Sequence, residues 1–86
     1  MPEISRFLGI VIAIYWNDHG IPHFHAKYGK DRASFSMDDL RLLEGGLPPR
    51  ITGLVLEWAA IHRDELMADW KLAVAKKPLQ PIPPLI

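Results

Sequence analysis

The spacing of apolar residues changes once along this 86-residue chain, which divides it into a strand-forming part and a helix-forming part. Over residues 33–38, apolar and polar side chains alternate, as in a half-buried strand. From Ile51 onward, apolar residues such as Val55 and Trp58 recur at helical spacing. Residues 44–49 lie between the two parts and read EGGLPP, a Gly- and Pro-rich boundary. Strands followed by helices predict an α+β fold.

Two further segments of the first half have strand character. Residues 8–16 read LGIVIAIYW, and both alternating sets of side chains are apolar, so we expect a strand that is covered on both faces or faces a partner. Residues 23–28 follow a turn-forming stretch that contains Gly20 and Pro22. Alternation along this second strand divides its side chains into two sets, Phe24, Ala26 and Tyr28 on one face and His23, His25 and Lys27 on the other.

The remaining segments complete the predicted architecture. With a short strand at residues 40–43, we expect a three- or four-stranded antiparallel sheet packed on one or two C-terminal helices, with the His23 face left open. No Pro or Gly interrupts residues 54–77, and an unbroken helix of that length is long for so small a domain. We therefore expect a bend or break at residues 62–64, where Asp64 would cap a second helix.

The C-terminal segment differs from the rest of the chain. We predict a single α+β domain at residues 1–77, followed by a Pro-rich strap or tail at residues 78–86. The segment reads PLQPIPPLI, and its four prolines exclude a helix and a central strand. Its Leu and Ile side chains are too apolar for a solvated tail. Either the segment packs on its own domain as a strap, or it docks on a second subunit and makes a homodimer.

The composition excludes several classes of function. Ten basic and ten acidic residues cancel, so the chain lacks the cationic excess on which non-specific nucleic-acid binding rests. Cysteine is absent, which excludes disulfides, thiolate nucleophiles and cysteine-ligated zinc. The apolar run at residues 7–16 is too short to span a bilayer and lacks the features of a signal peptide. We expect a cytoplasmic protein with no membrane partner.

Three of the four histidines lie within seven residues, and this is where metal binding or proton transfer near neutral pH is expected. His23 and His25 share one face of a strand, with Cα atoms about 6.5–7 Å apart, so their rings can converge on one ion. His19, in the preceding turn, is a third candidate ligand. Three histidines with one open position form a catalytic zinc arrangement. A carboxylate could instead complete a mixed site, from Asp18, Asp31 or Asp38.

A second interpretation of the same segment is metal-free acid–base catalysis. Cleavage of RNA through its 2′-hydroxyl needs a base, an acid and a cation. The candidate catalytic residues are His23, His25, Lys27 and Tyr28, with Arg32 close in sequence. The rest of the chain offers no basic stripe to bind the substrate.

A third interpretation gives the cluster no chemistry. The histidines then bond to turn backbones, and the segment is a folding element or a protein-contact surface with interface-type residues. His62, outside the cluster, falls at a core-facing helical position, so we expect a buried histidine with a satisfied partner. Trp16 ends the first predicted strand beside the histidine turn and is a candidate wall of a pocket.

Several motifs together resemble one family of small bacterial proteins, the domain of unknown function DUF4160. They are MPEISRF-x-GI-x-I, ND-H-x-x-PHFHA-x-YG, LEG-x-LP and LVLEW-x-x-x-HRDEL-x-x-x-W, and they cover residues 1 to about 76. The family signature corresponds here to Asn17, Asp18, His19, Pro22, His23, Phe24, His25, Ala26, Tyr28 and Gly29.

The resemblance implies a context rather than a reaction. Members of this family resemble components of toxin–antitoxin-like gene pairs, often encoded beside the DUF2442 family. The implied function is that of a small partner-binding component with a DUF2442-like partner. The alternatives are an RNA-cleaving toxin that uses the His23, His25 and Lys27 face, and a metal-binding protein, with zinc as the candidate ion, that uses His19, His23 and His25.

Overall fold

A computed structural model describes residues 2–18 and 20–86 as one antiparallel sheet followed by two helices. The strand order is β1-β2-β3-β4-β5, so each strand pairs with its sequence neighbours in a meander. The predicted α+β class is confirmed, with five strands rather than three or four. The elements are β1 (Glu3–Phe7), β2 (Ile10–Ala13), β3 (His23–Tyr28), β4 (Asp31–Ser36), β5 (Leu42–Gly45), α1 (Pro49–Ile61) and α2 (Arg63–Val74).

The additional strand arises because the apolar run at residues 8–16 is not one strand. Leu8 and Gly9 have φ of 51° and 80°, as a two-residue hairpin turn requires at both central positions. Phe7 pairs with Ile10 across this turn, so residues 3–7 form β1. The prediction of a strand beginning at residue 8 was wrong, because Leu8 and Gly9 form the turn between β1 and β2 although they belong to an apolar run.

The predicted break between the helices is confirmed. His62 separates α1 from α2, and its ring packs 5.6 Å from that of Trp58 while Nδ1 contacts the Glu65 carboxylate. The prediction that Asp64 caps α2 was wrong, because the N-cap position is His62 and no side chain caps it. Asp64 lies in the first turn, where its charge favours the helix dipole. Neither helix is long and apolar enough, over the described residues, to cross a membrane.

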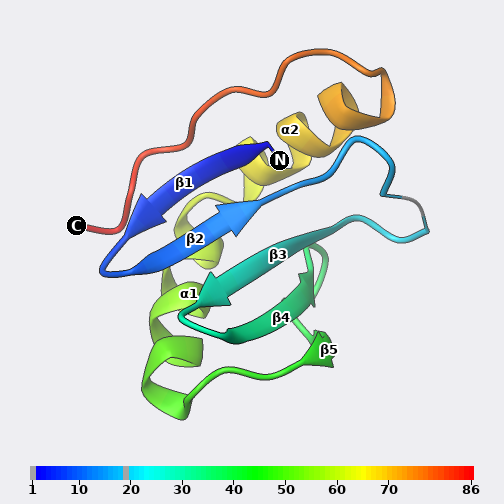
Figure 1. The fold of residues 1–86 in the computed structure, drawn as a ribbon. Helices are drawn as coiled ribbons and strands as arrows, with labels where there is room; N and C mark the ends of the chain where they lie inside the picture. The colour runs from blue at the N-terminus through cyan, green and yellow to red at the C-terminus, as the bar shows by residue number, and fades with distance from the viewer. Residues whose placement is uncertain (1, 19) are drawn as a thin grey trace.

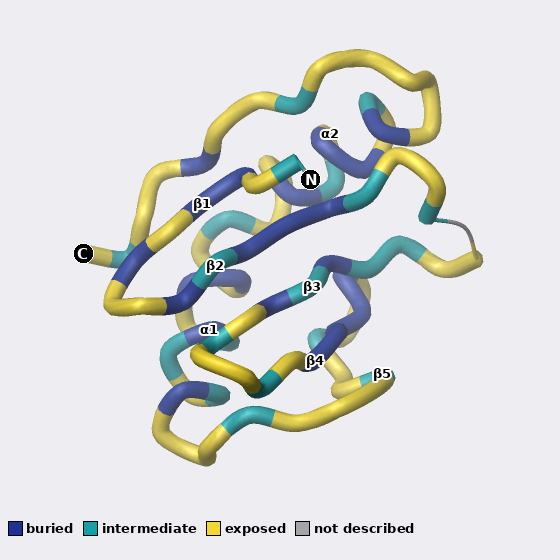
Figure 2. Tube along the Cα trace, viewed as in Figure 1, coloured by how far each residue is buried: buried dark blue, intermediate teal, exposed yellow. Residues whose placement is uncertain are grey.

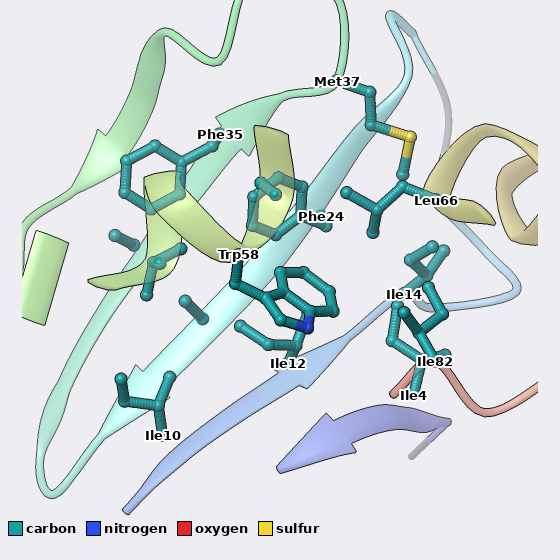
Figure 3. Packing of buried hydrophobic residues seen from close by; sticks show 14 of the residues in the cluster. Ile4, Ile10, Ile12, Ile14, Phe24, Phe35, Met37, Trp58, Leu66 and Ile82 are labelled. Atoms are coloured by element: carbon teal, nitrogen blue, oxygen red, sulfur yellow. The ribbon is translucent and has the colours of Figure 1, made fainter. Parts of the chain in front are cut away.

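Both helices lie on one face of the sheet and leave the other without a helical cover (Figure 1). Trp58 is fully buried between the layers, with ring centroids 5.7 Å from Phe7 and 6.1 Å from Phe24 (Figure 3). Figure 2 shows buried residues along β1, β2 and β4 and in both helices, whereas β5 is largely exposed.

The C-terminal segment runs back from α2 along the outer edge of β1 (Figure 1). Ile82 is buried, and its N–H donates to the Ile4 carbonyl oxygen over 2.7 Å. The Gln80 N–H donates to Asp69 Oδ1, and the Pro83 carbonyl oxygen accepts from Trp58 Nε1 over 2.9 Å. In this structure the segment therefore contacts β1 and both helices of its own chain.

Candidate metal centre

The turn after β2 and the first half of β3 bring one carboxylate and two imidazoles together. Asp18, His23 and His25 each offer one ligand atom, and these atoms all lie within 4.8 Å of one another. His25 Nε2 is 3.0 Å from Asp18 Oδ2, and His23 Nε2 is 3.5 Å from Asp18 Oδ1. The three side chains are 15 to 31% exposed, so the cluster is partly shielded and still open to a ligand from solution.

Asp18 is held by the turn that it closes. Its N–H donates to the Tyr15 carbonyl oxygen over 3.1 Å, and its Oδ2 accepts from the Tyr15 N–H over 3.0 Å. This pair of bonds fixes the carboxylate in the direction of β3. A short polar side chain in a turn commonly bonds to nearby backbone in this way, so the same residue that shapes the turn also presents the charge.

His23 is oriented by a backbone carbonyl. Its Nδ1 lies 2.8 Å from the Ile21 oxygen, and since a carbonyl only accepts, Nδ1 carries a proton. Nε2 is the nitrogen that remains to bind an ion, and it faces Asp18. The ring also packs 5.2 Å from Trp70 of α2, so His23 contacts the helical layer as well as the cluster. Metal-ligating histidines commonly donate the N–H of their other ring nitrogen to a backbone carbonyl in this way.

His25 lies in the middle of β3, opposite Ala13 of β2 and Ser34 of β4. Its Nε2 lies 3.0 Å from Asp18 Oδ2, and in the tautomer that carries the proton on Nε2 it donates a hydrogen bond to the carboxylate. The ring centroid is 4.6 Å from Tyr15 and 5.1 Å from His23. Strand alternation places His25 on the open face of the sheet, as the sequence predicted for it.

The spacing of the three ligand atoms fits one small ion. Metal–ligand distances of about 2.1 Å in a tetrahedral site place the ligand atoms about 3.4 Å apart. His25 Nε2 lies 3.0 Å from Asp18 Oδ2 and His23 Nε2 lies 3.5 Å from the other oxygen, Oδ1, and with one ligand atom from each residue all three atoms lie within 4.8 Å of one another. An ion in this position would replace the proton between His25 and Asp18, because an imidazole nitrogen binds metal only when it is deprotonated.

Comparison with known proteins identifies the family of the chain. Residues 9–71 match the family model of a domain of unknown function, DUF4160. The chain belongs to the DUF4160 family. The match contains the whole Asp18–His23–His25 cluster, from the β1–β2 turn to within three residues of the end of α2. Neither the curated proteins nor the solved structures yield a match. Family membership is thus established, and it carries no reaction with it.

The DUF4160 fold separates the other sequence-predicted site residues. His19 lies outside the described residues, so its part in metal binding stays a prediction. Of the described residues, the cluster includes neither Asp31 nor Asp38, two of the three carboxylates considered for a mixed site. Tyr28 packs against the core, on the face of β3 opposite His25, and the structure does not bring it to the histidines.

Trp16 connects the turn after β2 to the residues that follow α2. Its Nε1 donates to the Lys77 carbonyl oxygen over 3.0 Å, and its own carbonyl oxygen accepts from Lys76 Nζ over 2.6 Å. The neighbouring Tyr15, rather than Trp16, lines the hollow beside the cluster. Trp16 therefore positions the segment that carries Asp18.

Sequence reasoning missed one feature of this DUF4160 site, a hollow of about 320 Å³ on the open sheet face. Arg32 and Glu44 line it together with His25. The hairpin at Gly29 and Lys30 was a usable signal, because a two-residue turn pairs Lys27 with Arg32. Glu44 gave no such signal, since the register of β5 shifts at a bulge beside Ser34.

Proposed function

We propose that this DUF4160 protein binds a divalent transition metal ion through Asp18, His23 and His25. The observation that carries the proposal is the convergence of two imidazole Nε2 atoms on one carboxylate, with the proton of His23 fixed on Nδ1 by the Ile21 carbonyl. A metal-ligating histidine binds the ion with one ring nitrogen and donates the N–H of the other to a carbonyl or carboxylate. A histidine in a hydrogen-bond network does not need this division of roles.

The donor set supports a Lewis-acid role for the ion. Two histidines and one carboxylate suit zinc, and also iron(II) in sites that keep positions open. Three protein ligands leave at least one position for a molecule from solution. The partial exposure of His25 provides that access, so the site is suited to polarising an oxygen of a bound substrate.

Calorimetric titration with zinc tests this proposal. We expect about one equivalent of zinc to bind the purified protein, and His23→Ala and His25→Ala to weaken binding at least about 100-fold, because each removes a direct ligand. His62→Ala is the matched control, since His62 lies between the helices and outside the cluster. Binding that is absent, or equal in all four proteins, would contradict the proposal.

The metal-free RNA-cleavage function receives less support from the geometry. It needs several proton-transfer groups around one phosphate. Tyr28 lies on the other face of β3, and His23 directs Nδ1 to Ile21 and Nε2 to Asp18. Of the four candidate catalytic residues, His25 and Lys27 remain together on the open face, next to Arg32, and a single histidine beside two cations does not supply both the acid and the base.

A partner-binding role is the second candidate, and exposure at β5 favours it. β5 forms one edge of the sheet, its residues are mostly exposed, and Leu42 is 49% exposed. A partner of the DUF2442 kind, implied by the family resemblance, could add a strand at this edge. Leu42→Lys should abolish co-purification with such a partner, whereas Ile61→Lys on α1, also well exposed, should not. Equal co-purification by both variants would contradict this role.

A further inference from the structure

The hollow on the open sheet face adjoins the candidate metal centre and has its own charge pattern. His25 belongs to both, since it offers Nε2 to the cluster and lines the hollow. Small side chains form the floor, with Ala13 and Ser34 both buried on this face. Tyr15 stands at the His25 end, and Lys27 and Arg32 lie further along β3 and β4.

Lys27 and Arg32 are direct cross-strand partners in the β3–β4 register. Like charges in that position destabilise a sheet, so they need an explanation outside folding. Over residues 2–18 and 20–86 the structure shows no ion pair for either side chain, and both are exposed. Both line the same hollow, where Glu44 is the single carboxylate among the lining residues. Two unpaired cations aimed at one hollow are suited to an anionic ligand.

We propose that this hollow binds a phosphate monoester of about nucleotide size, with its phosphate held between the Lys27–Arg32 pair and the metal ion. The proposal rests on the metal site proposed above. The charges of Lys27, Arg32 and Glu44 sum to one positive charge. A divalent ion bound to the Asp18 carboxylate adds one further positive charge. A phosphate monoester carries about −1.5 to −2 charges near pH 7, which matches this excess.

The spacing along β3 allows one phosphate to meet both groups. His25 and Lys27 lie on the same face of the strand, with Cα atoms about 6.5–7 Å apart. The Arg32 guanidinium can bind two phosphate oxygens at once, and the Lys27 ammonium acts as a point charge beside it. A third phosphate oxygen then remains for the ion on His25.

The size of the hollow favours a small ligand over a polynucleotide. Its volume of about 320 Å³ lies at the lower end of the range for small-molecule sites. Tyr15 offers an aromatic side chain at the hollow for the organic part of the ester. RNA would need further cations along its backbone, and the chain has no excess of them.

Calorimetric titration with AMP tests the proposal on zinc-loaded protein. The test variant is Lys27→Ala/Arg32→Ala, and the matched control is Arg50→Ala/Lys71→Ala, which removes the same two charges from exposed positions on the helices. We expect the test variant to bind AMP at least about tenfold more weakly than the wild type, because charge-assisted bonds are lost, while zinc binding and the control are unchanged. Adenosine, which lacks the phosphate, should not bind detectably.

The Lys27→Ala/Arg32→Ala variant should be at least as stable as the wild type, so a loss of AMP binding would not reflect unfolding. Since Lys27 and Arg32 repel each other across the strands, their removal should leave the thermal midpoint equal or higher. Equal AMP affinity of test variant and wild type, or no AMP binding by protein that holds zinc, would overturn the proposal. Tighter binding of a short oligoribonucleotide than of AMP would also overturn it in favour of RNA. If the wild-type protein binds no zinc but binds AMP in a way that depends on Lys27 and Arg32, the metal site and the metal's part in AMP binding are both overturned. The anion site at Lys27 and Arg32 would then stand without the metal.

Discussion

His25 Nε2 lies 3.0 Å from Asp18 Oδ2, although the two residues are seven positions apart and belong to different parts of the fold. Asp18 closes the turn after β2, whereas His25 sits in the middle of β3. The carboxylate therefore has a local role in the turn and a second role at the sheet. Separating these two roles is the first test of the metal site.

Asp18→Asn separates them because the amide oxygen can still accept from the Tyr15 N–H, while the negative charge is lost. We expect zinc affinity to fall at least about 10- to 100-fold, with only a small change in thermal stability. Calorimetric titration and thermal unfolding measure the two effects. Asp38→Asn is the control, because Asp38 is exposed and outside the cluster. Equal zinc affinity of both variants would show that Asp18 is only a turn residue.

Gly45 is required where β5 ends beside β4. Its φ is +72°, and a Cβ there would lie 2.1 Å from the Arg32 carbonyl oxygen, a backbone atom that cannot move aside. We expect Gly45→Ala to lower the free energy of unfolding by about 1–3 kcal/mol, as measured by urea denaturation. The next residue provides the control, because a Cβ on Gly46 would meet nothing within 4 Å. A similar loss in Gly46→Ala would contradict this explanation.

Trp58 is the central residue of the core. It is fully buried, and its Nε1 donates to the Pro83 carbonyl oxygen. We expect Trp58→Ala to lower the free energy of unfolding by about 3–5 kcal/mol through lost packing. Trp16→Ala should cost much less, since Trp16 is 44% exposed. Chemical denaturation measures the unfolding free energy of both variants. Equal losses in the two would contradict this ranking.

Asp69, which accepts a hydrogen bond from Gln80 in the C-terminal segment, makes the unfolding free energy depend on pH. Burial raises its pKa above the ordinary 3.8, the Gln80 N–H opposes the rise, and Glu65 adds to it; Oδ2 has no hydrogen-bond partner among the described residues. Because the folded-state pKa is the higher one, its stabilising contribution is complete below about 3.8 and is lost as pH rises through the folded-state value. Asp69→Asn should therefore gain unfolding free energy relative to the wild type as pH rises across this window. Parallel pH profiles of the two proteins would contradict this.

The period change near residue 49 was enough to predict the fold class, since alternation and helical spacing are properties of the chain itself. The break at His62 followed from helix length. The number of strands did not follow, because the turn at Leu8 and Gly9 lies inside an apolar run and depends on backbone dihedrals that composition does not reveal.

The site could be predicted in part. Alternation put His25 and Lys27 on the open face, and Asp18 was one of three carboxylates considered. Choosing among the three required the turn at Tyr15, a local geometry with no periodic signature. The contact of His23 with Trp70 depends on how α2 lies against the sheet, which is a tertiary relationship.

The most direct measurement is a crystal structure of the zinc-loaded protein, with anomalous diffraction recorded at the zinc absorption edge. We expect one anomalous peak bound by Asp18 Oδ, His23 Nε2 and His25 Nε2, at about 2.0–2.2 Å from each atom. The proton on His23 Nδ1 would still bond to the Ile21 carbonyl oxygen. A peak elsewhere, binding through His23 Nδ1, or no peak in crystals grown with zinc would contradict the metal site.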